Sequence, residues 1–226
     1  GGLAERWLEA CEELGVERGI SVGWYRKLWS LYSGRGRFYH TLEHLRHMFA
    51  AIDQRSKGGG AAKRRDLVTI AVFFHDAVYD PTSTTNEADS GTLFEGFCDA
   101  AGGAIPPPDR EAVCSWIART ADHHSAPADG DLALFLDADL CVLGGAFHHY
   151  ARYAEAIRRE YCHFDAREFA TKRTKVLNKM LSLEHLFFTE AFREELEAKA
   201  RSNIRLEIRH LSLLCLPDGH PPSGGD

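Results

Sequence analysis

The stretch LVTIAVFFHD, residues 67–76, decides how the chain folds, because a mostly apolar run leads directly into an imidazole and a carboxylate. An unpaired ionised carboxylate is strongly disfavoured beside residues that belong in a core. On its own the pair is explained by a helix end, with Asp76 capping a turn and His75 as a satisfied core group. A divalent metal ion is the alternative partner, since imidazole and carboxylate are both good ligands.

The residues around this stretch predict a helix over 63–79, because apolar side chains recur there at helical spacing. The β-branched content leaves a strand open as an alternative. The same periodicity predicts two helices within residues 3–32 and further helices over 146–161, 166–181 and about 189–213. We therefore expect an all-α helical bundle.

The composition predicts one domain over residues 1–215, since 226 residues of which 44% are hydrophobic can bury a sizeable core. Residues 216–226, which contain DGHPPSGGD, are expected to form a disordered tail. No run approaches the ~20 apolar residues that span a bilayer. The N-terminal residues do not resemble a signal peptide.

The cysteines and the net charge narrow the class of protein further. The six cysteines are scattered without a C-x-x-C pair, which predicts neither a disulfide framework nor a zinc ribbon. We therefore expect a reducing, cytoplasmic location. A net charge of −6 argues against a broad nucleic-acid surface, although not against a local anion pocket.

Three of the twelve histidines follow one another in RFYHTLEHLRHM, residues 37–48. His40, His44 and His47 stand at i, i+4 and i+7, which places them on one side of a predicted helix. His44, with Met48 one turn further on, points with the apolar side and is a candidate metal ligand. His40 lies nearer the helix start, where a catalytic group could reach solvent, and His47 has no assigned role.

A second carboxylate falls on a buried helix face in FLDADL, residues 135–140. Asp139 follows Leu136 by three residues and Phe135 by four, so it shares their apolar face. Asp137 lies roughly 200° away at about 100° per residue. A buried Asp139 would need a metal ion or another cation beside it. Asp139 is the preferred ligand, and Asp137 stays open as the alternative.

Further polar residues have weaker signals. Glu87 follows the His-Asp pair by a short loop and could position a water or act as a general base, while Asn86 suits a helix N-cap. The buried face of the helix before residue 123 continues onto His123 and His124, so at least one of these imidazoles should turn inward.

Arg173 belongs to the apolar face of the helix over 166–181. An inward guanidinium could hold a phosphate with two hydrogen bonds. The alternative is an internal ion pair with Asp139 or Glu160.

Together His44, His75, Asp76 and Asp139, with His123 as an accessory ligand of a metal or phosphate, make a mixed nitrogen and oxygen shell. Such a shell suits a divalent Mn, Fe, Co, Ni, Zn or Mg ion, and its lack of thiolate argues against a closed structural zinc site. A metal with open positions lowers the pKa of a bound water toward ~7 and polarises a phosphoryl oxygen. His40 could then protonate the leaving alkoxide.

The order His44, His75-Asp76, Asp139 resembles the H…HD…D signature of the HD-domain metal-dependent phosphohydrolases, over roughly residues 37–143. RFYHTLEHL, FFHDAVYDPTSTTNE and FLDADLCVLG are similar to a subgroup described as predicted metal-dependent HD superfamily phosphohydrolases. The resemblance implies an HD-type helical bundle with a central metal bound by these four residues.

YHTLEHL also resembles the YHNxxH element of cyclic-nucleotide phosphodiesterases in the same superfamily. That likeness implies His40 as general acid and His44 as metal ligand. Thr41 stands where the element has Asn, and the nucleotide-gripping region of those enzymes has no counterpart here. A cyclic-nucleotide substrate is therefore not implied.

The sequence leads us to expect a hydrolase. Its substrate would be a phosphomonoester or phosphodiester, a small molecule of the nucleotide class. Two alternatives stay open. HD-type folds also support di-iron oxygenases, in which His123 or His124 would serve a second iron. A metal or nucleotide sensor without turnover is the other. The amphipathic last helix permits a homodimer.

Overall fold

The computed structural model describes residues 2–56, 62–122, 127 and 129–214. Within these ranges all regular elements are helices, as the all-α prediction requires, and no helix there is both long and apolar enough to cross a membrane. His123, His124 and the expected tail over 216–226 lie outside the described residues. In chain order the elements are α1 (Leu3–Glu13), α2 (Arg18–Tyr32), α3 (Leu42–Ser56), α4 (Arg65–Phe74), α5 (Asn86–Ala100), α6 (Pro107–Arg119), α7 (Gly130–Asp139), the 3₁₀ turn η1 (Leu140–Gly144), α8 (Phe147–Glu160), α9 (Ala166–Leu181), α10 (Glu190–Phe192), the π-helical turn η2 (Arg193–Glu197) and α11 (Ala198–Leu214).

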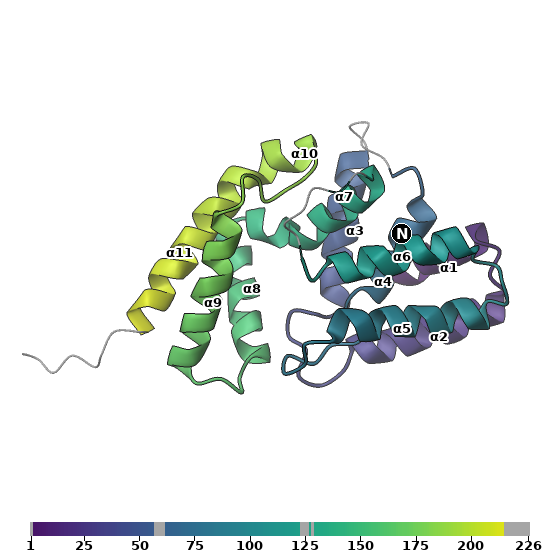
Figure 1. The fold of residues 1–226 in the computed structure, drawn as a ribbon, viewed down its shortest axis with the longest axis horizontal. Coiled ribbons are helices and arrows are strands. Elements are labelled where there is room, and N and C mark those ends of the chain that lie inside the picture. The colour runs from purple at the N-terminus through teal and green to yellow at the C-terminus, as the bar shows by residue number, and fades with distance from the viewer. Residues whose placement is uncertain (1, 57–61, 123–126, 128, 215–226) are drawn as a thin grey trace, which may run out of the picture.

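The helix α4 lies in the interior, since every residue from Leu67 to Phe74 is buried. It packs against α1, α6 and α7 (Figure 1). Aromatic rings fill this part of the core: the ring centroid of Trp7 is 5.2 Å from that of Phe73 and 5.2 Å from that of Phe97. A helix that is hydrophobic on all sides belongs in an interior, which accounts for a helix where β-branched residues left a strand possible.

The helix α4 ends at Phe74, so the predicted helix over 63–79 was too long at its C-terminal end. The guanidinium of Arg37 donates to the backbone carbonyls of Asp76 and Ala77, at 2.7 Å each, and to that of His40 at 2.9 Å. These bonds satisfy carbonyl groups just past the helix end. In a continuing helix the same carbonyls would accept from backbone N–H groups further along the chain. They also tie the His75-Asp76 corner to the segment before α3.

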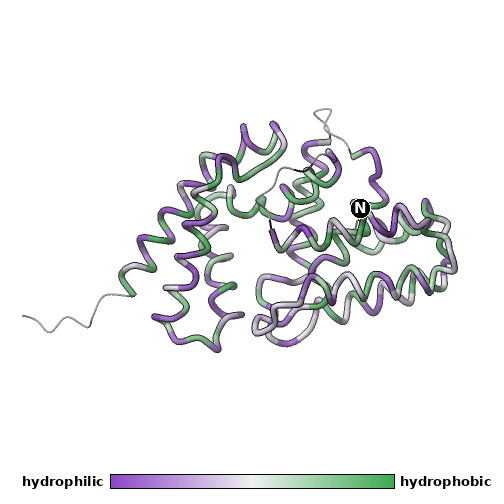
Figure 2. Tube along the Cα trace, viewed as in Figure 1, coloured by the Kyte–Doolittle hydropathy of each residue, from purple (hydrophilic) through white to green (hydrophobic). Residues whose placement is uncertain are grey.

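The helices α8, α9 and α11 lie together at the opposite end of the molecule from α1, α2 and α5 (Figure 1). Hydrophobic and hydrophilic residues alternate along these three helices, as expected for amphipathic helices (Figure 2). The last helix, predicted as one solvated helix over 189–213, is divided into α10, η2 and α11. It also buries more than predicted, since Ala200, Ile204 and Leu211 are buried.

The turn η1, which follows α7 and also contacts α3, packs against α11 and η2 and so joins the C-terminal helices to the centre of the fold. Gly144 stands at the closest point, because a Cβ atom built there would approach the backbone carbonyl oxygen of Leu196 to 2.9 Å and would overlap its side chain. Glycine is required at this position by the neighbouring backbone, which cannot withdraw as the end of a flexible side chain can.

Replacing Gly144 with Ala should lower the free energy of unfolding by about 1–3 kcal/mol, the usual cost of overpacking a core. The matched control is Gly23→Ala in the exposed face of α2, where a Cβ meets nothing within 4 Å. That change should stabilise the protein by up to about 1 kcal/mol. Urea unfolding of both variants measures the difference, and equal stability of the two would contradict the close approach.

Candidate metal centre

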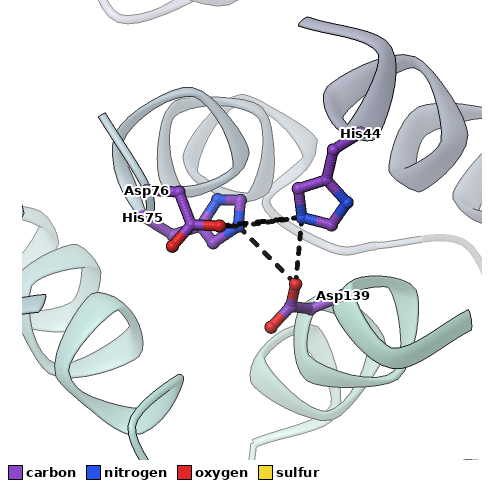
Figure 3. A group of neighbouring side chains, drawn as sticks. All are labelled: His44, His75, Asp76 and Asp139. Atoms are coloured by element: carbon purple, nitrogen blue, oxygen red, sulfur yellow. Dashed lines mark hydrogen bonds and ion pairs between the residues drawn. The ribbon is translucent and has the colours of Figure 1, made fainter. Parts of the chain in front are cut away.

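Four side chains from three separate parts of the chain converge at one point (Figure 3). One ligand atom from each of His44, His75, Asp76 and Asp139 lies within 4.8 Å of the others. The Nε2 atom of His44 is 3.1 Å from an Asp139 carboxylate oxygen, and the Nε2 atom of His75 is 2.9 Å from an Asp76 oxygen. The two Nε2 atoms are 3.2 Å apart. All four ligands proposed from the sequence therefore meet in the fold.

The ends of the helices bring these groups together. His44 lies in the first turn of α3, His75 is the C-cap of α4 with Asp76 next to it, and Asp139 is the last residue of α7. Because α7 packs on both α3 and α4, the three helices hold the cluster from different directions. Both imidazoles are almost fully buried, whereas the side chains of Asp76 and Asp139 keep 17% and 15% of their surface exposed. The cluster is thus buried on its histidine side and open on its carboxylate side.

The hydrogen bonding of His75 assigns its proton. Its Nδ1 atom donates to the backbone carbonyl of Val72 at 2.9 Å. The neutral imidazole therefore presents the lone pair of Nε2 to the centre of the cluster, which is the arrangement found when a histidine binds a metal.

The electrostatics of the cluster favour a positive charge at its centre. Burial lowers the pKa of His75, but Asp76 and Asp139 outweigh it and raise this pKa well above its ordinary value. Burial lowers the pKa of His44 and prevails there. Burial raises the pKa of Asp76, but His75 and His40 outweigh it and lower this pKa. Two carboxylates and two nearly touching imidazole nitrogens thus need one shared cation, either a proton or a metal ion.

The donor set fits a divalent metal ion. Two imidazole nitrogens and two carboxylate oxygens give the mixed shell that Mn, Fe, Co, Ni, Zn or Mg-type ions accept, and thiolate takes no part in the cluster. Such an ion would balance both carboxylates and would remove the need for a proton between His44 and His75. The group could therefore hold a metal ion, whose identity the residues leave open.

His40 lies beside the cluster, but on a different kind of element from the one predicted. The helix α3 begins at Leu42, so His40 lies in the preceding turn and does not share a helix face with His44 and His47. Its Nε2 atom is 3.9 Å from an Asp76 oxygen and its ring stacks on Tyr79 at 4.1 Å between centroids. The His47 side chain is 57% exposed.

Glu160 fixes the orientation of His40. One of its oxygens lies 2.7 Å from Nδ1 of His40 and also accepts from the Tyr79 hydroxyl at 2.9 Å. The other oxygen accepts from the backbone N–H groups of Phe38, Tyr39 and His40. Burial raises the pKa of Glu160, but these hydrogen bonds, above all that with His40, outweigh it and lower this pKa to about 2. A buried charged carboxylate thus turns Nε2 of His40 toward Asp76.

The second aspartate of FLDADL is a structural residue. Asp137 is fully buried and accepts hydrogen bonds from the backbone N–H groups of Phe188 and Thr189 and from the Thr189 hydroxyl. Burial raises its pKa to about 6 against the effect of these bonds. Asp139 is therefore the residue in the cluster, and the side of α7 opposite to it is covered by the segment before α10.

Glu87 and Arg173 are not part of this cluster. Glu87 is partly exposed in the first turn of α5. Arg173 forms an ion pair with Glu207 at 2.8 Å and donates to the Tyr153 hydroxyl at 3.1 Å. The alternative of an internal ion pair was thus right, but its partner is Glu207 and not Asp139 or Glu160 as expected. His123, the accessory candidate, lies outside the described residues.

Reasoning from the sequence missed the roles of Glu160, Arg37 and Tyr79. Glu160 follows Ile157 by three residues on a helix, which puts a carboxylate on the buried face and could have marked it as a partner for an imidazole. Arg37 and Tyr79 carry no comparable signal, because their roles depend on contacts between segments distant in sequence.

The chain matches no protein-family model, no curated protein and no solved structure. The assignment of the cluster therefore depends on its geometry and on the chemistry of its residues.

The Glu160 network predicts how stability changes with acid. Because the folded pKa of Glu160 lies near 2, below its ordinary value of 4.5, its contribution is complete above pH 4.5 and is lost as the pH falls toward 2. The stability difference between the wild type and Glu160→Gln should shrink by about 2 kcal/mol between about pH 5 and about pH 3. Urea unfolding at each pH measures it.

Glu155→Gln, which removes an exposed carboxylate from the same helix α8, is the matched control. A pH-independent difference for Glu160→Gln would contradict the charged network.

Metal binding should stabilise the fold through His44. At a Mn²⁺ concentration one hundred times its Kd, the free energy of unfolding should rise by about 2.7 kcal/mol. His44→Ala should lose this increment, because the variant lacks one of the four ligands, whereas His47→Ala on the same helix should keep it. Thermal unfolding with and without Mn²⁺ checks both, and an undiminished increment in His44→Ala would exclude this cluster as the site.

Proposed function

We propose that the protein is a metal-dependent phosphohydrolase that cleaves a phosphomonoester or phosphodiester, a small molecule that we expect to be a nucleotide. One observation carries the proposal: a histidine held by a buried carboxylate stands beside a cluster able to bind a divalent ion. The Nε2 atom of His40 lies 3.9 Å from Asp76, on the side where the cluster keeps its exposure. A metal ion with an acid at its edge suits the hydrolysis of a phosphate ester.

A bound divalent ion would supply an activated water at neutral pH and would polarise a phosphoryl oxygen. His44, His75, Asp76 and Asp139 would hold that ion. Because both carboxylates are partly exposed, one side of the cluster stays accessible for a phosphate group.

His40 would act as the general acid. Burial lowers its pKa, but Asp76 and Glu160 outweigh burial and raise it above the ordinary value, which favours the protonated form of the imidazole. With Nδ1 committed to Glu160, the proton available for transfer is the one on Nε2, which faces Asp76. It would pass to the leaving oxygen of the ester as the bond to phosphorus breaks.

Two features support this role for His40 over a purely structural one. Glu160 takes the position of a carboxylate that orients a catalytic imidazole and stabilises its charged form. Tyr79 stacks on the His40 ring and donates a hydrogen bond to the same Glu160 carboxylate, which limits rotation of the imidazole. Glu87 is retained as a proposed positioner of the attacking water, and Arg173 as a proposed phosphate ligand would first have to leave Glu207.

A screen of nucleotides and other phosphate esters with Mn²⁺, Co²⁺, Mg²⁺, Ni²⁺ and Fe²⁺ should reveal phosphate release. On the substrate found, His40→Ala should lower kcat by about 10²–10⁴-fold while metal binding persists, since general acid catalysis typically contributes this much. Asp76→Ala should lose both activity and metal. His47→Ala is the control and should retain both.

Other results would replace the proposal. Full turnover by His40→Ala would remove the general acid. Tight nucleotide binding without phosphate release would favour a sensor, and a mixed-valent iron signal with no phosphate release would favour an oxygenase.

A further inference from the structure

A cavity of about 540 Å³ opens between α3, η1 and α8. Its size lies within the range of pockets that bind small organic molecules. Of the four cluster residues only His44 lines it, whereas Asp76 and Asp139, which carry the exposed part of the cluster, do not. His40 is also not among its lining residues. The cavity is therefore a compartment that meets the cluster at His44 and not at its carboxylates or at His40.

His44 offers a polar atom to this compartment. Its Nε2 atom faces the cluster, while Figure 3 shows the other ring nitrogen, Nδ1, on the side away from Asp76 and Asp139. The residue is only 2% exposed, and within the described residues Nδ1 has no hydrogen-bond partner. In contrast, Nδ1 of His75 is bonded to Val72. A metal at Nε2 would leave a proton on Nδ1, and that donor would need an acceptor.

The charges around the cavity favour an anion. Both acidic residues that line it are already paired, Glu195 with Arg55 at 2.8 Å and Glu43 with Arg46 at 3.0 Å. Arg152 lies exposed on α8 at the edge of the cavity, and it has no ion pair in the described part of the chain. The Arg152 guanidinium therefore gives this edge of the cavity a positive charge, although the chain has a net charge of −6.

The remaining wall suits a flat organic body. Tyr39 lines the cavity with its ring 4.7 Å from both the His44 and the Tyr153 ring centroids, and Ala51 and Val142 add aliphatic surface. Aromatic and aliphatic surface beside polar groups that can fix a ligand's orientation is the usual composition of a small-molecule site.

We propose that this cavity binds a small organic anion with a flat ring system, whose negative group pairs with Arg152 and whose acceptor atom takes the N–H of His44 Nδ1. The site goes beyond the proposed hydrolysis, since it lies behind the metal ligand. Its occupant would favour the tautomer of His44 that leaves Nε2 free for a metal ion. Binding at the two sites should therefore be mutually reinforcing.

Two probes that differ only in charge test the site. Anilinonaphthalene sulfonate carries an anionic group on a flat ring system, and N-phenylnaphthylamine has the same rings without the charge. Fluorescence titration of the folded, metal-free protein should give saturable binding of both. Arg152→Gln should weaken the sulfonate about fivefold, the upper value for an exposed ion pair, and leave the neutral probe unchanged.

Two alanines on different faces of α8 give matched controls for location. Ala156 lines this cavity, and Ala154 lines a separate groove between α8 and α11. Ala156→Trp should weaken both probes at least tenfold, and Ala154→Trp should weaken neither. The reverse pattern, or an equal effect of Arg152→Gln on the two probes, would overturn the proposal. Arg152→Gln alters only an exposed side chain, so it gives an answer even if Ala156→Trp does not fold.

The contact with His44 has its own test. Saturating sulfonate should tighten Mn²⁺ binding about threefold or more in a calorimetric titration, and the neutral probe should tighten it less. Sulfonate that binds through Arg152 without changing Mn²⁺ affinity would overturn the contact with Nδ1. A protein that binds the sulfonate as predicted but takes up no Mn²⁺ would refute the proposed hydrolase and the coupling, and would leave the anion site standing.

Discussion

The approach of two imidazole nitrogens to 3.2 Å between two carboxylates is the constraint on which the rest of the site depends. Such an arrangement would be costly in a protein interior without a positive charge at its centre, because buried carboxylates need a partner and facing nitrogen lone pairs repel. A proton on His75 can supply that charge, and so can a divalent ion. The ion satisfies all four groups at once, whereas a proton serves two or three.

The surrounding fold keeps this arrangement in place. The helix α4 is buried along its whole apolar run, so its end cannot move without disturbing the core. Arg37 holds the turn after it, and Glu160 holds the turn before α3, each through several backbone groups. The two turns carry Asp76 and His40. Arg37 and Glu160 therefore fix the two turns, and their hydrogen bonds determine where His40 lies relative to the cluster.

Much of this could be predicted from the sequence where one helix face decided the outcome. His44 and Asp139 share faces with apolar neighbours, and the end of the apolar run marked His75-Asp76, so these four ligands were accessible to reasoning by periodicity. His40 was placed on the wrong kind of element, because the turn before α3 depends on Glu160, a residue 120 positions away. Periodicity also could not reveal that Phe188 and Thr189 cover Asp137. Contacts between distant segments decide such details, and local patterns carry no record of them.

The most direct test of the account is a crystal structure of the protein grown with Mn²⁺, with anomalous diffraction used to locate the metal. We expect one strong anomalous peak about 2.1 Å from Nε2 of His44, Nε2 of His75 and one oxygen each of Asp76 and Asp139. Absence of a peak there at saturating Mn²⁺, with the four side chains still converging, would contradict the claim that the cluster is a metal centre.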